Sequence, residues 1–259
     1  MARNTTSTNG DVFLPKQVQK IDSFDLKPGR KLAAKYEVIS KLGAGWEGEV
    51  YKVNEISTGI ERAAKLFFPQ RNVRNRSARV YARKLHKLRR CAILIQYHTK
   101  EIISCRRIPV TVLISDYVEG ILLSEFLKRM PGKRLPPYQA THLLYSLAKG
   151  IEEIHLLNEY HGDLHSDNII VNKFGLSFEI KLLDLFNSTD AKLANMRDDI
   201  CSLIQIYHES MGGAKHYRKL PQTVKNICCG LKRSLILKKF RTVSQLREHL
   251  ELLEWECDW

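Results

Sequence analysis

The sequence lacks any apolar run that approaches the roughly 18 residues needed to cross a bilayer as a helix. Residues 1–20 also lack the apolar core of a secretory signal. The six cysteines include no Cys-x-x-Cys pair of the kind that holds a metal. We therefore expect a cytoplasmic protein with no transmembrane segment, whose thiols are reduced.

Acidic residues are scarce. The chain has 28 Asp and Glu against 42 Lys and Arg, a formal net charge of +14. Such an excess favours anionic partners, among them nucleotides, nucleic acid, lipid head groups and acidic proteins. Between Arg62 and Lys100 there is no Asp or Glu at all.

Part of this acid-free interval predicts a basic helix. Residues 71–90 carry nine Lys or Arg, and Tyr81, Leu85 and Leu88 form one apolar stripe at helical spacing. The rest of this helix would be a basic face. Such a face is either solvated or in contact with an anionic partner, and both interpretations stay open.

The residues that are present are typical of a globular protein, with 44% hydrophobic and 8% aromatic content. A chain of 259 residues can form one large domain or two lobes that share a cleft. Residues 1–30 are predicted to be a flexible tail, because Asn, Thr, Ser and Gly dominate the first ten and residues 27–30 are typical of a turn.

The most informative stretch is the polar loop within residues 160–171, which follows a helical run and precedes an apolar strand. It carries Asp163 and Asn168, and a second apolar strand brings Asp184 sixteen residues after Asn168. Two strands beside one loop can hold these three side chains around one point. Mg²⁺ prefers such oxygen ligands together with substrate phosphates, and the separate carboxylate of Asp163 could accept a proton from a hydroxyl.

A glycine turn lies between two predicted strands near the beginning of the chain, at Gly43, Gly45 and Gly48. Without Cβ atoms, the backbone N–H groups of such a turn can approach phosphate oxygens closely. A plain hairpin is the simpler interpretation of this motif alone. Fifteen residues after Val50, Lys65 lies in an apolar strand, where it either points to solvent or needs an anionic partner.

The remaining segments predict further elements. Residues 110–115 predict a buried strand that ends in a turn at residues 116–120, and residues 138–157 predict an amphipathic helix. Helical runs are also predicted near residues 221–236 and 243–256. Asp199 begins another helical segment, where it either caps the helix N-terminus or holds the backbone of the polar loop.

Together these segments resemble the protein-kinase-like superfamily. The catalytic-loop pattern His-x-Asp-Leu-x-x-x-Asn is met by His161, Asp163, Leu164 and Asn168. The order of glycine loop, strand lysine, inter-lobe turn, catalytic loop and metal aspartate is similar to the family's order. The resemblance implies an α+β, two-lobed protein-kinase-like fold, with a β-rich N-lobe at residues 31–117. The helical C-lobe would occupy residues 118–259 and contain a shortened activation segment.

The resemblance also implies individual roles. Mg²⁺-ATP, or its Mn²⁺ form, would contact Leu42, Gly43, Gly45, Gly48, Val50, Ala63, Lys65, Asp116 and Val118. The metal would be held by Asn168 and Asp184. The catalytic residues would be Asp163, Lys65 and His165, with Lys65 neutralising phosphates and Asp163 orienting the acceptor hydroxyl.

Several departures from the family pattern matter. Kinases place a glutamate in the helix after the strand lysine, and this chain has none there. Lys65 would therefore contact phosphate directly, pair with Asp184 or use a distant acid such as Glu101. Only fourteen residues separate Asp184 from Asp199, and Glu47 brings a negative charge to the glycine loop.

The implied function is transfer of the γ-phosphoryl group of Mg-ATP to a hydroxyl, most simply Ser or Thr of a protein. The His-Gly-Asp-Leu-His sequence at residues 161–165 is also similar to aminoglycoside, choline and lipopolysaccharide kinase loops. A sugar-like or anionic metabolite is therefore an alternative acceptor. A nucleotide-binding pseudokinase or scaffold is a further alternative, favoured by the missing helix glutamate.

Overall fold

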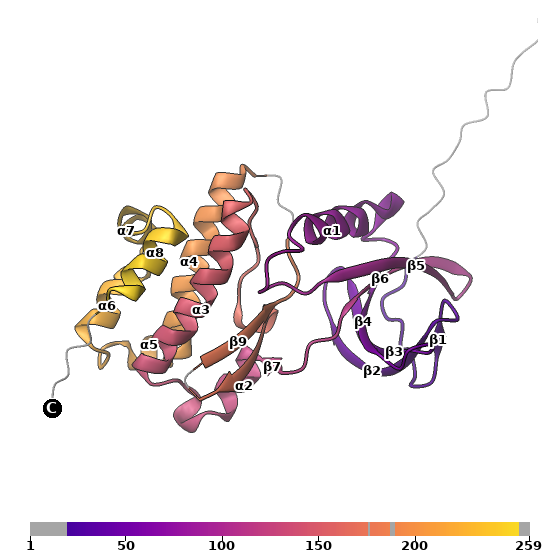
Figure 1. The fold of residues 1–259 in the computed structure, drawn as a ribbon, viewed down its shortest axis with the longest axis horizontal. Helices are drawn as coiled ribbons and strands as arrows, with labels where there is room; N and C mark the ends of the chain where they lie inside the picture. The colour runs from indigo at the N-terminus through magenta and orange to yellow at the C-terminus, as the bar shows by residue number, and fades with distance from the viewer. Residues whose placement is uncertain (1–19, 176, 187–189, 254–259) are drawn as a thin grey trace, which may run out of the picture.

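A computed structural model of the chain describes residues 20–175, 177–186 and 190–253. The chain forms a β-rich upper lobe and a mainly helical lower lobe, joined by a linking segment at residues 117–120 (Figure 1). The α+β, two-lobed architecture expected from the sequence is confirmed. The domain boundary predicted between residues 117 and 118 falls within this linking segment.

The upper lobe contains one antiparallel sheet of six strands in the order β1-β2-β3-β4-β6-β5. The strands are β1 (Lys31–Leu32), β2 (Tyr36–Ala44), β3 (Gly48–Glu55), β4 (Glu61–Phe67), β5 (Tyr97–Cys105) and β6 (Ile108–Asp116). Strands β2 and β3 meet at the glycine turn, as the sequence predicts. Val50 of β3 is the register partner of Lys65 in β4.

Alternation along β3 and β4 gives the sheet two different faces. Tyr51 and Leu66 are fully buried in the core of the upper lobe. Val50, Ala63 and Lys65 alternate with these buried residues and are only partly buried on the opposite face. Because this second face looks toward the lower lobe, it presents Lys65 to the space between the lobes.

The prediction that residues 1–30 form a flexible tail is wrong for part of this segment. Ile21 and Phe24 are 1% and 4% exposed and belong to the core of the upper lobe. The ring of Phe24 stacks on Phe68 at a centroid distance of 5.2 Å, and its backbone N–H donates to Glu49 Oε2 at 3.2 Å. Two isolated apolar residues in a polar stretch show no periodicity, which is why composition alone misassigned them. Residues 1–19 lie outside the described part of the chain.

Helix α1 (Arg76–Lys87) follows a short 3₁₀ turn, η1 (Val73–Asn75), and lies beside β5 and β6 (Figure 1). Tyr81, Leu85 and Leu88 are buried, as predicted from their spacing. Lys84 is also buried, with 7% of its surface exposed. The prediction that the remaining face of this helix is entirely basic and outward is therefore wrong at Lys84.

The lower lobe is built from helices around one small sheet with strand order β7-β8-β9. The strands are β7 (Ile121–Leu122), β8 (Ile169–Phe174) and β9 (Ser177–Leu182). The helices are α2 (Leu123–Arg129), α3 (Pro137–Leu156), α4 (Lys192–Ser210), α5 (Ala214–Tyr217), α6 (Gln222–Cys228), α7 (Arg233–Lys239) and α8 (Val243–Glu251). Short 3₁₀ turns are η2 (Pro131–Lys133), η3 (Ser166–Asn168) and η4 (Cys229–Leu231).

Two helical predictions need adjustment. The run expected near residues 221–236 is two helices, α6 and α7, because Cys229, Gly230 and Leu231 have φ angles of +49°, +60° and +58°. These left-handed values cannot continue a right-handed helix. Helix α4 begins at Lys192, so Asp199 lies inside it and is not its N-terminal cap.

One buried cluster extends from α1 into the lower lobe. It contains Tyr81 and Leu85 of α1 and Leu88 directly after it, together with Leu147 of α3 and Leu203 of α4. Aligned apolar side chains on α3 provide much of this core, as the amphipathic pattern predicts. In the described residues, no helix combines the length and the apolar character needed to cross a membrane.

Candidate functional site

A buried carboxylate holds the backbone of the polar loop at residues 160–171, which we call the catalytic loop because of the pattern that it resembles. Asp199 of α4 is 1% exposed and accepts hydrogen bonds from the backbone N–H groups of His161 and Gly162, both at 2.8 Å. His155 Nε2 donates to the same carboxylate at 3.0 Å. Of the two interpretations that the sequence left open for Asp199, support of the polar loop is therefore correct.

Gly162 is required by the backbone at this point. Its φ is +85°, and a Cβ there would lie 2.9 Å from the ring of Tyr160. A larger residue would need to adopt a left-handed conformation and displace the ring. The backbone conformation and the close approach of Tyr160 therefore favour glycine at residue 162.

A second group of hydrogen bonds joins the catalytic loop to the segment that carries Asp184. His161 Nε2 donates to the carbonyl oxygen of Leu183 at 2.8 Å. The N–H of Leu183 donates to Asn168 at 2.9 Å, and the N–H of Phe186 donates to His161 at 2.9 Å. Burial lowers the pKa of His161, which favours the neutral imidazole that this arrangement uses. The segment with Asp184 is consequently fixed beside Asn168.

Three sequence-predicted residues meet in this loop. Asn168 Nδ2 lies 2.9 Å from the Asp163 carbonyl oxygen and 3.1 Å from Asp163 Oδ2. It also lies 2.9 Å from His165 Nε2, and that nitrogen is 3.7 Å from Asp163 Oδ2. Half of the Asp163 side chain is exposed, so its carboxylate is accessible to a ligand.

Lys65 is surrounded by acids from two different loops. Its Nζ lies 2.6 Å from Asp184 Oδ1 and 3.2 Å from Glu47 Oε2. The same nitrogen lies 4.6 Å from the centroid of the Tyr81 ring on α1. Burial alone would lower the pKa of Lys65, but Tyr81, Asp184 and Glu47 together raise it above its ordinary value. The amine is therefore a cation at neutral pH.

The three partners proposed for Lys65 from the sequence can now be compared. Pairing with Asp184 occurs. The prediction of pairing with Glu101 is wrong, because Glu101 Oε1 instead binds Lys35 Nζ at 2.7 Å. The sequence analysis did not identify Glu47 as a partner of Lys65, although it noted the acid in the glycine loop.

The glycine loop is pressed against β4 at its base. A Cβ on Gly48 would lie 1.8 Å from the carbonyl oxygen of Leu66, so only glycine fits without movement. The N–H of Gly45 donates to the Gly48 carbonyl at 2.9 Å and closes the turn. Gly43 is the register partner of Val50, and Leu42 beside it is 46% exposed.

Two residues predicted to contact ATP, Asp116 and Val118, lie where β6 passes into the linking segment. Asp116 ends β6, and its Oδ1 lies 3.2 Å from Arg62 Nη1 and 2.5 Å from His98 Nε2. The Asp116 carboxylate is thus paired with other residues of the upper lobe. Val118 follows two residues later and is partly buried. Contact of Asp116 and Val118 with ATP stays a prediction.

Lys84 forms a contact that the sequence analysis missed. Its Nζ donates to the carbonyl oxygen of Phe186 at 2.6 Å and lies 3.8 Å from the centroid of the Tyr160 ring. Burial lowers its pKa to about 8. Residues 71–90 contain eight other Lys or Arg residues. The composition of this segment therefore gave no sign that Lys84 differs from its basic neighbours. Lys84 attaches α1 directly to the segment after Asp184.

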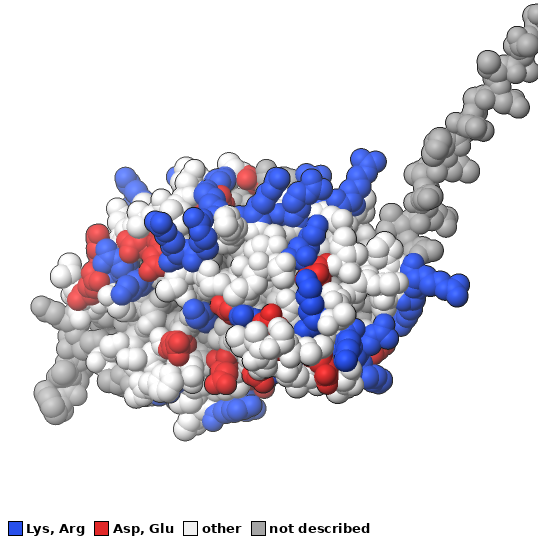
Figure 2. Space-filling model, turned by 45° about the vertical axis from the view of Figure 1, so that its right-hand side comes forward, with Lys and Arg blue, Asp and Glu red and all other residues white. Residues whose placement is uncertain are grey.

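The other basic residues of this region remain on the surface. Figure 2 shows Lys and Arg side chains gathered along the upper edge of the molecule, where α1 lies. We call the basic surface the four exposed arginines Arg74, Arg76, Arg79 and Arg83. None of the four has an ion-pair partner in the part of the chain that the structure describes. Lys87 differs, since its Nζ binds Glu159 at 2.7 Å.

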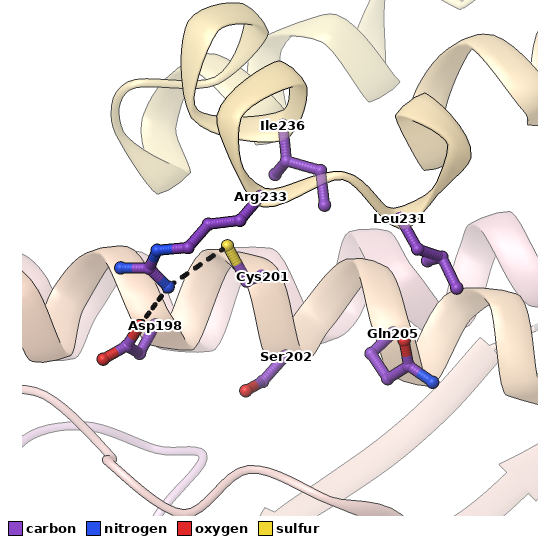
Figure 3. Close-up of a pocket in the computed structure, with 7 residues that line it drawn as sticks. All are labelled: Asp198, Cys201, Ser202, Gln205, Leu231, Arg233 and Ile236. Carbon is purple, nitrogen blue, oxygen red and sulfur yellow. Dashed lines mark hydrogen bonds and ion pairs between the residues drawn. The ribbon is translucent and has the colours of Figure 1, made fainter.

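A separate hollow of about 400 Å³ lies between α4 and α7 (Figure 3). Arg233 crosses it to pair with Asp198 and lies 3.8 Å from the Cys201 sulfur. Asp198 therefore links α4 to α7, whereas its neighbour Asp199 binds the backbone of the catalytic loop. The hollow contains none of the predicted site residues; its lining is Asp198, Cys201, Ser202, Gln205, Leu231, Arg233 and Ile236.

Comparison with known proteins gives consistent results. The family model described as "Protein kinase domain" matches residues 36–208. Cell division control protein 2 homolog C from Antirrhinum majus is 28% identical over 192 residues, which cover 71% of this chain and 62% of that protein. Serine/threonine-protein kinase pkn2 from Myxococcus xanthus is 28% identical over 158 residues, which cover 59% of this chain and 18% of that protein. The chain thus spans less than two thirds of the length of these relatives.

Solved structures show the same fold. The PknI kinase domain of Mycobacterium tuberculosis superposes with a TM-score of 0.61 and 16% sequence identity. The match covers 87% of this chain and 98% of that one. A double mutant of the same domain gives a TM-score of 0.63 at 17% identity, covering 87% of this chain and 96% of that one.

Proposed function

The chain belongs to the protein kinase domain family, and from this premise we propose that it is an ATP-dependent phosphotransferase. One observation carries the proposal. Asp163, Asn168 and Asp184 are held within one network of backbone and side-chain hydrogen bonds, and Lys65 is paired with Asp184. These are the residue types that phosphoryl transfer needs for charge neutralisation and for orienting the acceptor.

The donor set fits Mg²⁺ or Mn²⁺. The Asn168 amide nitrogen is directed at Asp163, which leaves the amide oxygen as the atom to bind a cation. Asp184 supplies a carboxylate, and Mg²⁺ commonly takes one or two carboxylates plus substrate phosphates. When bound, the metal would neutralise charge on the phosphate oxygens. Asn168 and Asp184 are the residues that would hold it.

ATP would lie between the glycine loop and this acidic site. The residues proposed around it are those predicted from the sequence, which the fold distributes over β2, β3, the turn between them, β4, the end of β6 and the linking segment. Lys65 faces the space between the lobes and carries the positive charge suited to a phosphate. Displacing Asp184 from Lys65 would free each of them for its own ligand.

The transfer itself requires one bond to form and one to break. The oxygen of the acceptor hydroxyl attacks the γ-phosphorus, and the bond from that phosphorus to the β–γ bridging oxygen breaks. Asp163 accepts the hydroxyl proton, for which its exposed carboxylate is suited. His165 lies beside Asp163, where it can contact the transferred group. Positioning and charge neutralisation supply most of the rate enhancement in such reactions.

We propose Ser or Thr of a protein as the acceptor, because the curated relatives include proteins named as serine/threonine-protein kinases. The short connection between Asp184 and Asp199 and the His165 position favour a sugar-like or anionic metabolite as the second candidate. Mass spectrometry after incubation with ATP and a lysate separates the two. If only metabolites, and no protein, gained a phosphoryl group, a protein acceptor would be excluded.

ATP turnover with Mg²⁺ or Mn²⁺ tests the proposal, comparing the natural protein with Asp163→Asn and Lys65→Met. We expect turnover to be lost in both variants and retained in Glu101→Gln, which removes an acid from the same lobe but outside the site. Turnover unaffected by the first two changes would refute this site. Nucleotide that stabilises the fold without any turnover would instead indicate a pseudokinase.

The basic surface supports a second, compatible function, contact with an anionic macromolecule. Its four arginines are exposed and carry one sign of charge. A labelled nucleic-acid duplex is a suitable probe, and we expect its affinity to fall steeply as salt is added. Replacing Arg76, Arg79 and Arg83 by Ala should weaken the binding. Binding that salt does not affect would exclude this contact.

A further inference from the structure

The geometry points to Glu47 as the positioning residue for Lys65, in place of the acid that α1 lacks. This inference rests on the proposed function, because it concerns the lysine that would bind phosphate. Glu47 belongs to the glycine loop, so the acid reaches Lys65 from the phosphate-binding loop and not from a helix. Its Oε2 lies 3.2 Å from Lys65 Nζ.

The backbone of Glu47 is fixed relative to the strand that carries Lys65. The N–H of Phe68, immediately after β4, donates to the Glu47 carbonyl oxygen at 2.9 Å. The next residue, Gly48, is packed so closely on the Leu66 carbonyl that no Cβ fits. A carboxylate anchored in this way has a defined position and does not depend on the open tip of the loop.

Neighbouring side chains of the loop point in opposite directions. Trp46 is 68% exposed, and its ring stacks with the Arg71 guanidinium at 4.1 Å on the outside of the lobe. Glu47 is directed inward, where 37% of its side chain is exposed. The Trp46–Arg71 contact holds the tip outward and so favours the inward direction of Glu47.

The other neighbours of Lys65 cannot serve as its permanent partner. Helix α1 presents Tyr81, whose ring attracts the cation but carries no charge at neutral pH. Asp184 has a second task, because the proposed function assigns it to the metal. Lys65 itself is only 12% exposed, so water compensates little of its charge. Glu47 is therefore the acid that remains for Lys65 when Asp184 binds a cation.

This arrangement joins two roles that belong to different segments when the acid comes from a helix. The roles are contact with the phosphates and orientation of the lysine. Here the glycine loop, whose base is fixed on β4, would both cover the phosphates and carry the carboxylate that orients Lys65. Alignment of the lysine thus depends on the loop and not on the position of α1. Helix α1 is attached to the lower lobe by other contacts, through Lys84 and Lys87.

Steady-state kinetics of Glu47→Gln, with Glu101→Gln as the matched control, test the assignment. We expect kcat for Glu47→Gln to fall roughly 10-fold to 100-fold, because a misplaced catalytic group costs about that much. Glu101→Gln should stay within about twofold of the natural protein. An increase of kcat/KM in Glu47→Gln would show that Glu47 blocks the phosphate site, and an unchanged rate would show that it has no role; both would overturn the inference.

Rescue by a helix acid distinguishes positioning from a purely structural role. The double variant Glu47→Gln, Tyr81→Glu places a carboxylate on α1 beside Lys65. We expect it to recover most of the lost kcat. A double variant that remains folded by its thermal transition but is no more active than Glu47→Gln would overturn the inference.

A measurement that needs no turnover separates failure of this inference from failure of the proposed function. Reductive methylation followed by mass spectrometry reports the reactivity of the Lys65 amine. Glutamine cannot form the ion pair that Glu47 makes with the amine at 3.2 Å, so Lys65 should be less restrained and should react several-fold faster in Glu47→Gln than in Glu101→Gln. Equal rates would overturn the assignment of Glu47 even if the protein proves to be an active kinase.

Discussion

The backbone N–H of His161 donates a hydrogen bond of 2.8 Å to Asp199 Oδ2, although the two residues lie 38 positions apart in the sequence. The other oxygen of the same carboxylate accepts from Gly162. Asp199 lies in the middle of α4, which is buried in the lower lobe. The helix core therefore sets the position of the loop that carries Asp163 and Asn168.

Replacing Asp199 with Asn should loosen this loop. The amide can accept only one of the two backbone hydrogen bonds and turns its NH₂ group toward a second donor. We expect a loss of about 2–3 kcal/mol in the free energy of unfolding and a fall in turnover of roughly 100-fold. Denaturant titration and ATP turnover measure the two effects. Asp198→Asn, at the neighbouring position that pairs with Arg233, should leave turnover within about twofold.

Gly48→Ala should affect both stability and nucleotide binding. The added Cβ would lie 1.8 Å from the Leu66 carbonyl oxygen, so the glycine loop must move away from β4. We expect a destabilisation of about 1–3 kcal/mol and a higher KM for ATP. Gly45→Ala is the control for stability, because nothing lies within 4 Å of a Cβ at that position. Equal unfolding free energies for the two variants would contradict the close approach at Gly48.

Lys84 should make stability depend on pH in a particular direction. Its pKa is about 8 in the folded protein, against 10.5 as the ordinary value. Above about pH 8, the unfolded chain binds more protons at this group than the folded chain does, so the free energy of unfolding rises with pH. Below that pH both states carry the proton, and the cost of burying the charge is fully present.

The size of this effect follows from the shift in pKa. Between about pH 7 and about pH 10, we expect Lys84 to contribute an increase of about 2–3 kcal/mol in the free energy of unfolding. Lys84→Met should remove this increase, while Lys87→Met should keep it, because nearly half of the Lys87 side chain is exposed. Denaturant titrations at several pH values provide the comparison. Parallel pH profiles for the natural protein and Lys84→Met would show that the amine is not buried as a cation.

Asp184→Asn should weaken metal-dependent nucleotide binding. The variant removes the carboxylate proposed to hold Mg²⁺ and one of the two acids around Lys65. We expect the Mg²⁺ concentration that gives half of the nucleotide-induced thermal stabilisation to rise at least about 10-fold. Asp167→Asn is the control, because Asp167 lies in the catalytic loop next to Asn168 and its carboxylate accepts a hydrogen bond from Ser124. A similar rise in both variants would argue against Asp184 as a metal ligand.

The sequence predicted those parts of the site that are encoded by short-range spacing. Asp163 and Asn168 lie only five positions apart, in one loop with a 3₁₀ turn, so their proximity follows from the chain itself. Lys65 was likewise predicted to lie in an apolar strand and to need an anionic partner unless it pointed to solvent, and it pairs with Asp184. Asp184 could be added because strands β8 and β9 are consecutive and pair directly.

The missed features depend on contacts between segments that are distant in sequence. Lys84 lies 102 positions from Phe186, and no local pattern separates it from the arginines around it. Glu47 reaches Lys65 only because the Phe68 N–H and the Leu66 carbonyl fix the glycine loop on β4. Ile21 and Phe24 likewise pack in a core that is formed by strands later in the sequence. Composition and periodicity carry no information about such pairings.

The shared core has a consequence for how the chain can be divided. Tyr81 and Leu85 of α1, with Leu88 directly after it, are buried with Leu147 and Leu203 of the lower lobe, although α1 precedes the linking segment. A fragment that ends at this segment would expose the apolar side of α1 to water and retain only the smaller cluster inside the sheet. The upper lobe is therefore not an autonomous folding unit, and the two lobes should gain and lose their structure in a single cooperative transition.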